Sequence, residues 1–293
     1  MKTTMLINKF APFDAALQDA FDRSIAVALE EDIGTGDRTG MLVPAQARVQ
    51  AQVVVRESAL LCGAPWFEAV MQTLDASIRI DWHHAEGARM NAEDVVCTID
   101  APARALLTAE RSALNFMQLL SGVATATRRY VELVAGTDAA ILDTRKTLPG
   151  LRLAQKYAVR VGGGKNQRLA LYDGILIKEN HIAAAGGIPQ AMAAAHESGG
   201  GVPIQIEVEN LQQLQQALDA GAVSILLDNF DLHAMREAVV LNRGQSVLEA
   251  SGGISLETVR AIAETGVDRI SIGSLTKDIR ATDYSLRILG PVA

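Results

Sequence analysis

The sequence Ile175-Leu-Ile-Lys178-Glu-Asn-His181 carries a short apolar run into charged and polar residues, and five other runs in the second half of the chain do the same. They are Ile141-Leu-Asp-Thr-Arg145-Lys146, Ile204-Gln-Ile-Glu207-Val-Glu209, Ile225-Leu-Leu-Asp228-Asn229, Val247-Leu-Glu249-Ala-Ser251-Gly-Gly253 and Ile270-Ser-Ile-Gly273-Ser274. Helix-like stretches separate them. Buried strands that alternate with helices predict a parallel sheet, either closed as an α/β barrel or open and doubly wound.

The residues that end these runs predict where a site lies. In a barrel, the carboxyl ends of the strands meet at one face, where active sites are built. That face would carry Arg145, Lys146, Lys178, Glu209, Asp228, Ser251 and Gly273. Cations, carboxylates and glycines together suit a polyanionic ligand that is held with a divalent metal.

The first part of the chain lacks this regular alternation. Its patterns predict helices at residues 14–31 and 66–74 and strands at residues 49–56, 78–82 and 95–99, followed by a long helical stretch. We therefore expect an N-terminal mixed α+β domain over residues 1–118 and an α/β barrel catalytic domain over residues 119–278. The tail, residues 279–293, is too short for a domain and is expected to pack on the first one.

The composition limits the classes of partner. The 293 residues are 49% hydrophobic and carry a net charge of -7, which argues against a nucleic-acid binder. Residues 145–178 are nevertheless basic, with Asp173 as their one acid. A basic segment in an acidic protein indicates a small anionic ligand, although a solvated helix face is an alternative for Arg152, Lys156 and Arg160.

The cysteines and the apolar segments indicate where in the cell the protein is expected. Cys62 and Cys97 lie far apart in apolar sequence without a Cys-x-x-Cys spacing, which favours buried thiols in a reducing cytosol over a zinc site. The N-terminus lacks the pattern of a signal peptide, and no apolar run reaches the ~18 residues of a membrane span. We therefore expect a cytoplasmic protein without a membrane partner.

Three segments carry most of the cations. Arg145 and Lys146 directly follow a strand and suit carboxylate or phosphate groups, although an ordinary surface loop is the alternative. The glycine run 162–164 leads into Gln167 and Arg168, which fits a loop that approaches a ligand; a simple helix cap is the alternative. Lys178 ends a very apolar strand and could pair with a substrate carboxylate, form a Schiff base or make a structural salt bridge.

The carboxylates suggest a metal. Glu209 and Asp228 end successive strands, and two carboxylates on one rim can hold Mg2+ directly or through water. By alternation, Glu207 is expected to point the same way as Glu209. The glycine-containing ends at Ser251-Gly252-Gly253 and Gly273 offer backbone amides of the kind that bind phosphate in such barrels. His181 is either a general acid or base or a hydrogen-bonded loop histidine.

Several stretches together resemble the quinolinate phosphoribosyltransferase family, from about residue 30 to residue 278. They are Glu110-Arg-Ser-Ala-Leu-Asn115, Leu120-Ser-Gly-Val-Ala124, Leu142-Asp-Thr-Arg-Lys-Thr-Leu-Pro-Gly-Leu-Arg152, Lys156-Tyr-Ala158, Gly162-Gly-Gly164, Leu176-Ile-Lys-Glu-Asn-His-Ile182, Glu207-Val-Glu-Asn210, Leu227-Asp-Asn-Phe230, Glu249-Ala-Ser-Gly-Gly-Ile254 and Glu264-Thr-Gly-Val-Asp268. The resemblance implies a mixed N-terminal domain and an incomplete α/β barrel (type II phosphoribosyltransferase-like). It also implies assembly as a homodimer or higher oligomer with shared active sites.

The resemblance implies a reaction and roles for residues. Quinolinate and phosphoribosyl pyrophosphate, with Mg2+, would give nicotinate mononucleotide, pyrophosphate and carbon dioxide. The implied quinolinate site comprises Arg111 from a neighbouring subunit, Arg145, Arg168 and Lys178. Lys146 would contact both substrates; Glu209 and Asp228 would hold ribose hydroxyls and the metal; Ser251, Gly252, Gly253 and Gly273 would bind the 5′-phosphate. Lys146, Glu209 and Asp228 are thus the expected catalytic residues.

One position departs from the family pattern. Family members often have His after the glycine run and Asn, where this chain has Gln167, and Gln cannot carry an imidazolium charge. Gln167 is still expected to contact substrate. Three alternatives stay open: a related phosphoribosyltransferase for nicotinate or another acid, a barrel lyase with a Schiff base on Lys178, and a non-catalytic binding protein.

Overall fold

The computed structural model describes residues 8–291, which form two compact units. The first unit contains the described residues through Ala126, together with residues 148–162 and those from Asp278 onward. The second contains residues 127–147 and 163–277. The helix α3 (Ala103–Leu133) begins in the first unit and ends in the second.

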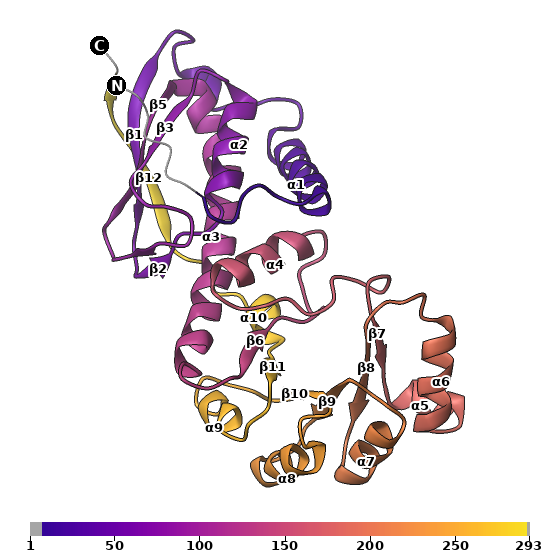
Figure 1. Cartoon of the computed structure of the whole chain (residues 1–293). Coiled ribbons are helices and arrows are strands. Elements are labelled where there is room, and N and C mark those ends of the chain that lie inside the picture. The colour runs from indigo at the N-terminus through magenta and orange to yellow at the C-terminus, as the bar shows by residue number, and fades with distance from the viewer. Residues whose placement is uncertain (1–7, 292–293) are drawn as a thin grey trace. The chain divides into compact units, whose positions relative to one another are not determined.

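The first unit is a four-stranded antiparallel sheet with helices (Figure 1). Its strand order is β12 (Tyr284–Pro291), β1 (Arg48–Val55), β5 (Val95–Pro102) and β3 (Arg79–Trp82). The other elements are α1 (Ala15–Ile33), the 3-10 turn η1 (Gly40–Leu42), α2 (Ala64–Leu74), α4 (Arg152–Val161) and the paired short strands β2 (Ala59–Leu60) and β4 (Arg89–Met90). Strand β12 uses the last described residues, so the chain end completes this sheet by pairing with β1.

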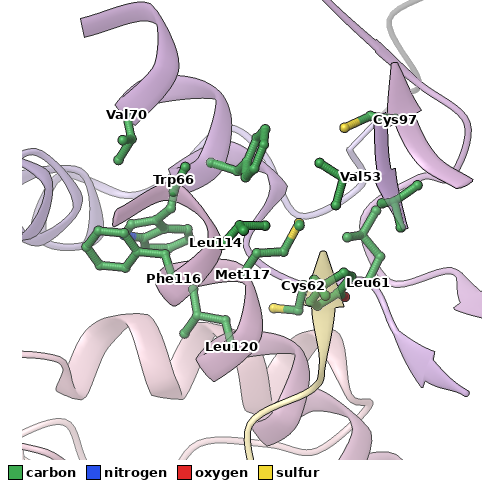
Figure 2. Close-up of a cluster of buried hydrophobic side chains, with 14 of the residues drawn as sticks. Val53, Leu61, Cys62, Trp66, Val70, Cys97, Leu114, Phe116, Met117 and Leu120 are labelled. Carbon is green, nitrogen blue, oxygen red and sulfur yellow. The ribbon is translucent and has the colours of Figure 1, made fainter. Parts of the chain in front are cut away.

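Large apolar side chains from α2, α3 and the sheet fill the core of this unit (Figure 2). Trp66, Met117 and Leu120 are fully buried. The ring of Trp66 lies 5.3 Å from that of Tyr157 on α4. Since aromatic pairs contribute beyond their buried area, this contact gives a physical reason why residues 148–162 group with the first unit. The predicted barrel domain, residues 119–278, includes this segment, whereas the structure groups it with the first unit.

A buried carboxylate lies at the start of α2. Glu86 accepts hydrogen bonds from the backbone N–H groups of Gly63 (2.8 Å) and Ala64 (3.1 Å) and from the hydroxyl of Tyr157 (3.0 Å). These contacts satisfy backbone donors that a helix start leaves without an intrahelical partner. Burial nevertheless raises the pKa of Glu86 to about 7, because the loss of water outweighs the hydrogen bonds.

Glu86 should therefore make stability depend on pH. Its folded-state pKa exceeds the value of 4.5 expected when unfolded, so its contribution is fully present below about pH 4.5 and is lost as the pH rises towards 7. We expect Glu86→Gln to reduce the fall in unfolding free energy between pH 5 and pH 8 by about 2 to 3 kcal/mol. Urea unfolding of both proteins at several pH values measures this change.

The two proteins are compared by how their unfolding free energy changes with pH. Its value at a single pH is not suitable, because Gln has one acceptor oxygen where Glu has two, so the substitution also alters absolute stability. Titratable groups common to both proteins cancel in the comparison. Equal slopes in the two proteins would contradict a raised pKa at Glu86.

The second unit is a six-stranded, wholly parallel sheet. Its strands are β6 (Ala140–Leu142), β7 (Ile175–Ile177), β8 (Ile204–Val208), β9 (Ser224–Asp228), β10 (Val247–Ser251) and β11 (Arg269–Ser271). Its remaining helices are α5 (Glu179–Ala185), α6 (Ile188–Ser198), α7 (Leu211–Asp219), α8 (Leu232–Asn242), α9 (Val259–Ala263) and α10 (Ser274–Lys277). All six predicted runs contribute a strand.

The strand order is β6-β11-β10-β9-β8-β7 (Figure 1). The first strand of this unit thus pairs with the last one, while β6 and β7 are the two ends of the sheet. This is the incomplete barrel that was expected, rather than an open doubly wound sheet. Side-chain caps fix where the helices start: Asn210 accepts from the backbone N–H of Gln213 (2.9 Å), and Asp231 accepts from that of Ala234 (2.8 Å).

Between residues 8 and 291, no helix combines the length and the apolar character needed to cross a membrane. Cys62 and Cys97 are both free and buried, as their apolar sequence context predicted. Burial raises the pKa of each thiol, so neither is prepared to act as a nucleophile.

Candidate functional site

A cavity of about 780 Å³ opens at the carboxyl ends of the strands of the second unit. Alternate residues along the strands line it, as a period of two requires. Strand β8 contributes Gln205 and Glu207, and β10 contributes Glu249 and Ser251. The cavity therefore lies where the sequence placed it, and a cavity of this size can hold a small organic substrate.

The structure brings most of the predicted site residues together. Ten of them line this one cavity: Arg145, Lys146, Gln167, Arg168, Lys178, Asp228, Ser251, Gly252, Gly253 and Gly273. Two do not. Arg111 is exposed on α3 among the residues of the first unit, and Glu209 is exposed beyond the end of β8.

Glu207 takes the place at the cavity wall that was expected for Glu209. Strand β8 ends at Val208, and the backbone N–H of Glu209 donates to the side chain of Gln213 (2.7 Å) at the start of α7. Glu207 lines the cavity, whereas Glu209 follows the last residue of β8 and is not among the lining residues. That both glutamates point the same way stays a prediction from the period of two.

Glu207 is paired with Lys178. Lys178 Nζ lies 2.8 Å from Glu207 Oε2, and both side chains line the cavity. The lysine side chain is 46% exposed, so its charge remains available to a ligand. Its backbone is fixed by His181, whose Nδ1 accepts a hydrogen bond from the Lys178 N–H (3.0 Å). His181 is thus a hydrogen-bonded histidine that orients Lys178 at the start of α5, and a role for it as a general acid or base stays a prediction.

Two guanidinium groups concentrate positive charge in the cavity. Burial lowers the pKa of Arg168, and the charge of Arg145 lowers it further, which indicates that the two cations lie close together. The Arg168 Nη1 donates to the carbonyl of Gly174 (2.7 Å). Because like charges repel in a partly buried place, such a pair favours the binding of an anion between or beside them.

The glycines allow close approach of the backbone at two strand ends. A Cβ at Gly252 would lie 3.1 Å from the backbone nitrogen of Asn229, and its φ of +107° is disfavoured for other residues. A Cβ at Gly273 would lie 2.9 Å from the Cδ of Lys146, so this glycine leaves room for the lysine side chain. Such glycine-rich strand ends suit a phosphate group that approaches main-chain N–H groups.

Sequence reasoning missed three polar residues that lie on strands of the sheet or directly after one. Asp143 and Glu249 are fully buried, and Gln205 is nearly so. Asp143 Oδ1 accepts from the backbone N–H of Gln167 (2.9 Å), and Asp143 Oδ2 accepts from Asn166 Nδ2 (2.6 Å). Polar residues within or directly after otherwise apolar strands were the signal that could have found them, because a buried polar group requires partners.

A divalent metal fits this donor set at Asp228. Asp228 lines the cavity with a carboxylate that accepts from the side chain of its neighbour Asn229 (2.9 Å). No group of three or more His, Cys, Asp and Glu side chains suited to a metal occurs in the part of the chain that the structure describes. Mg2+ usually binds one or two carboxylates plus substrate phosphates and water, so one carboxylate at this rim fits Mg2+ and does not fit a closed structural zinc site.

Two family models match the chain. The model described as "Quinolinate phosphoribosyl transferase, N-terminal domain" matches residues 35–121, and the model described as "Quinolinate phosphoribosyl transferase, C-terminal domain" matches residues 123–287. Together they span most of the chain.

Curated relatives agree with these models. A probable nicotinate-nucleotide pyrophosphorylase [carboxylating] of Bacillus subtilis is 41% identical over 259 residues, covering 88% of this chain and 90% of that protein. A nicotinate-nucleotide pyrophosphorylase [carboxylating] of Mycobacterium leprae is 41% identical over 278 residues, covering 92% and 97%.

Solved structures agree as well. The nicotinate-nucleotide pyrophosphorylase of Francisella tularensis superposes with a TM-score of 0.91 at 42% identity, covering 96% of this chain and 99% of that one. The human nicotinic acid phosphoribosyltransferase shares only the fold, with a TM-score of 0.59 at 14% identity.

Proposed function

Since the chain belongs to the quinolinate phosphoribosyltransferase family, we propose that it transfers the phosphoribosyl group of phosphoribosyl pyrophosphate to quinolinate, with decarboxylation. The products are nicotinate mononucleotide, pyrophosphate and carbon dioxide, a step in the biosynthesis of NAD. The observation that carries the proposal is one cavity that gathers Arg145, Lys146, Arg168 and Lys178 beside Asp228. This set neutralises a dicarboxylate together with a heavily anionic co-substrate.

The cations bind and orient the acid. Arg145 and Arg168 present planar guanidinium groups that match carboxylates, and Lys178 supplies a compact charge from the adjacent strand end. Glu207 holds Lys178 in place until substrate binds. The main chain at Ser251, Gly252 and Gly253, with that at Gly273, accommodates the 5′-phosphate of the ribose.

The carboxylates act on the charge that develops at C1 of the ribose. As the bond from C1 to pyrophosphate breaks, C1 becomes positive, and the pyridine nitrogen of quinolinate forms the new bond. Asp228 and Glu207 line the same cavity and stabilise that positive charge, while Lys146 neutralises the departing pyrophosphate. The role first expected for Glu209 is thus assigned to Glu207. The bond between the ring carbon next to the pyridinium nitrogen and its carboxylate then breaks, and carbon dioxide leaves. The electron pair of that bond stays on the ring carbon, where the adjacent positive nitrogen stabilises it, and a proton from solvent bonds to this carbon.

Mg2+ is part of the proposal. Asp228 would hold it with phosphate oxygens of the co-substrate and water, and bound Mg2+ supplies charge neutralisation of the pyrophosphate. Glu209 is exposed and lies outside the cavity wall, so a role for it as a ligand stays a prediction that would operate through water.

Parallel assays test the substrate. The purified protein with Mg2+ and phosphoribosyl pyrophosphate is expected to consume quinolinate and release carbon dioxide, and to leave nicotinate unchanged. The reason is that five cations in one cavity, the four named above and Lys277, suit two carboxylates better than one. Nucleotide and carbon dioxide are measured together. Equal turnover of nicotinate would favour the related phosphoribosyltransferase, and covalent trapping of Lys178 by borohydride with substrate would favour the lyase.

We also propose a homodimer or higher homo-oligomer in which Arg111 completes the site of a neighbouring subunit. The support is that Arg111 is exposed on α3 while its predicted partners line a cavity of the second unit. Mixing Arg111→Ala chains with Lys178→Ala chains should restore activity, because one site of a mixed dimer then receives an intact Arg111 and an intact Lys178. Activity is measured after subunit exchange has been verified by mass.

Two matched mixtures complete this test. Each variant mixed with itself is the control and should stay poorly active. If exchange is complete and activity stays at that level, Arg111 is a cation of its own subunit.

The free, buried thiols of Cys62 and Cys97 suit a reducing compartment, and we propose a cytoplasmic location.

A further inference from the structure

Gln167 is held within the cavity by hydrogen bonds from both ends of its amide group. Its Nε2 lies 2.7 Å from Oε2 and 2.9 Å from Oε1 of Glu249, and 3.0 Å from Oε1 of Gln205. Its own Oε1 accepts from the backbone N–H of Arg168 (3.0 Å). An amide that donates two hydrogens and accepts one has a defined orientation, so this side chain is fixed rather than free to rotate towards a ligand.

Glu249 accepts hydrogen bonds from the side chains of both Gln167 and Gln205. This carboxylate is fully buried in the middle of β10, and Gln205 Nε2 also donates to it (3.0 Å). Among the residues that the structure describes, its hydrogen-bond donors are thus two neutral amides. A buried carboxylate loses its water, and removing one of few donors is costly. Gln167 and Glu249 are therefore mutually dependent.

The same amide determines where Arg168 lies. The chain before Arg168 is held next to the end of β6 by Asp143, the residue that follows this strand, which accepts from the backbone N–H of Gln167. The chain at Arg168 is tied to β10 through the side chain of Gln167. Arg168 then extends from this point into the cavity, where its guanidinium also reaches the carbonyl of Gly174. A shift of the 166–168 segment would move the guanidinium relative to Arg145.

We infer that Gln167 is a positioning residue for Arg168, acting through Glu249 and Gln205, and does not serve as a direct ligand of the substrate. The inference rests on the proposed function, because Arg168 is assigned there to a carboxylate of quinolinate. The substrate contact that was expected for the side chain of Gln167 is thereby assigned to its neighbour Arg168. The neutral amide is the chemistry that this place requires, since it donates to a buried carboxylate and accepts from a backbone N–H at once.

The first test separates binding from turnover. We expect Gln167→Ala to raise the KM for quinolinate by about tenfold to a hundredfold, the loss that follows from weakening one charge-assisted contact. The KM for phosphoribosyl pyrophosphate and kcat should each change by less than about threefold, because a positioning residue for one substrate acts on the binding of that substrate. Gln212→Ala, an exposed glutamine on α7, is the matched control and should leave all three values unchanged.

The second test exchanges the two partners. Gln167→Glu places a carboxylate against Glu249 and should raise the KM for quinolinate at least as much as Gln167→Ala, since like charges in a buried place repel. Adding Glu249→Gln restores an amide opposite a carboxylate at nearly the same volume. The double variant should therefore recover most of the lost affinity. A direct substrate ligand would not be rescued by a change at residue 249.

The outcomes distinguish this inference from the function. If the wild-type protein fails to release carbon dioxide from quinolinate, the proposed function fails. If the wild-type protein is active, and Gln167→Glu is not rescued by Glu249→Gln or Gln167→Ala leaves the KM for quinolinate unchanged, the positioning role fails. A double-mutant cycle on the unfolding midpoints of the same four proteins measures the coupling of residues 167 and 249 without any substrate, and additive shifts would also overturn the inference.

Discussion

Replacing Asp228 by Asn is expected to lower kcat by roughly a hundredfold or more, the effect typical of removing one group that stabilises charge in a transition state. Asn has the same shape as Asp but no charge, so it neither balances a positive C1 nor holds Mg2+ well. Asp228 ends β9 at the cavity, where its backbone lies in register with Ser251 of β10. The variant should therefore fold and bind quinolinate, and lose turnover.

Steady-state kinetics at a series of Mg2+ concentrations measure this prediction. The concentration of Mg2+ that gives half of the maximal rate should rise, because one carboxylate ligand is lost. Asp219→Asn, an exposed aspartate at the end of α7, is the matched control and should behave as the wild type. An Asp228→Asn protein with normal kcat and normal Mg2+ dependence would show that neither the metal nor the ribose depends on this carboxylate.

Replacing Lys178 by Met is expected to raise the KM for quinolinate by about tenfold to a hundredfold. The substitution keeps the apolar stem and removes the charge. It has a second consequence, because Glu207 loses the cation 2.8 Å away and its carboxylate then repels the carboxylates of the substrate. Direct calorimetric titration with quinolinate measures the affinity without turnover.

A second substitution tests this reasoning. Glu207→Gln added to Lys178→Met removes the unpaired carboxylate and should recover part of the affinity for quinolinate. The same addition should lower kcat, because Glu207 is also assigned to the charge at C1. Lys165→Met, an exposed lysine outside the cavity wall, is the matched control. An affinity for quinolinate that stays at the wild-type level in Lys178→Met would remove Lys178 from the substrate site.

The comparison between a single and a double variant matters here because the cavity residues are coupled. Lys178 with Glu207, and Gln167 with Glu249, are each in direct contact, so the effects of their substitutions are not expected to add. Arg145 and Arg168 are coupled by repulsion instead. Cations that repel one another within a cavity are stabilised more by a bound anionic ligand than cations that lie far apart on a surface.

The sequence by itself determined the strands of the second unit and most of the residues at their ends. Runs such as Ile225-Leu-Leu-Asp228 predict both a strand and the place of its polar residue. A buried strand must be apolar, and its polar end must lie at the edge of the sheet. Ten of the twelve predicted site residues line one cavity, eight of them at strand ends for this reason and Gln167 and Arg168 from the loop after the glycine run. Local patterns of this kind depend only on residues that are close along the chain.

The tertiary structure decided what depends on residues far apart in the chain. The pairing of β6 with β11, the completion of the first sheet by β12 and the grouping of residues 148–162 with the first unit all join distant segments. Glu207 lines the cavity from β8, whereas Glu209 follows the end of that strand, and its backbone N–H donates to Gln213 of α7. Glu249 became part of the site only when Gln167 and Gln205 met it across the sheet. A buried charge is stable only with such partners, and the chain brings them together by folding.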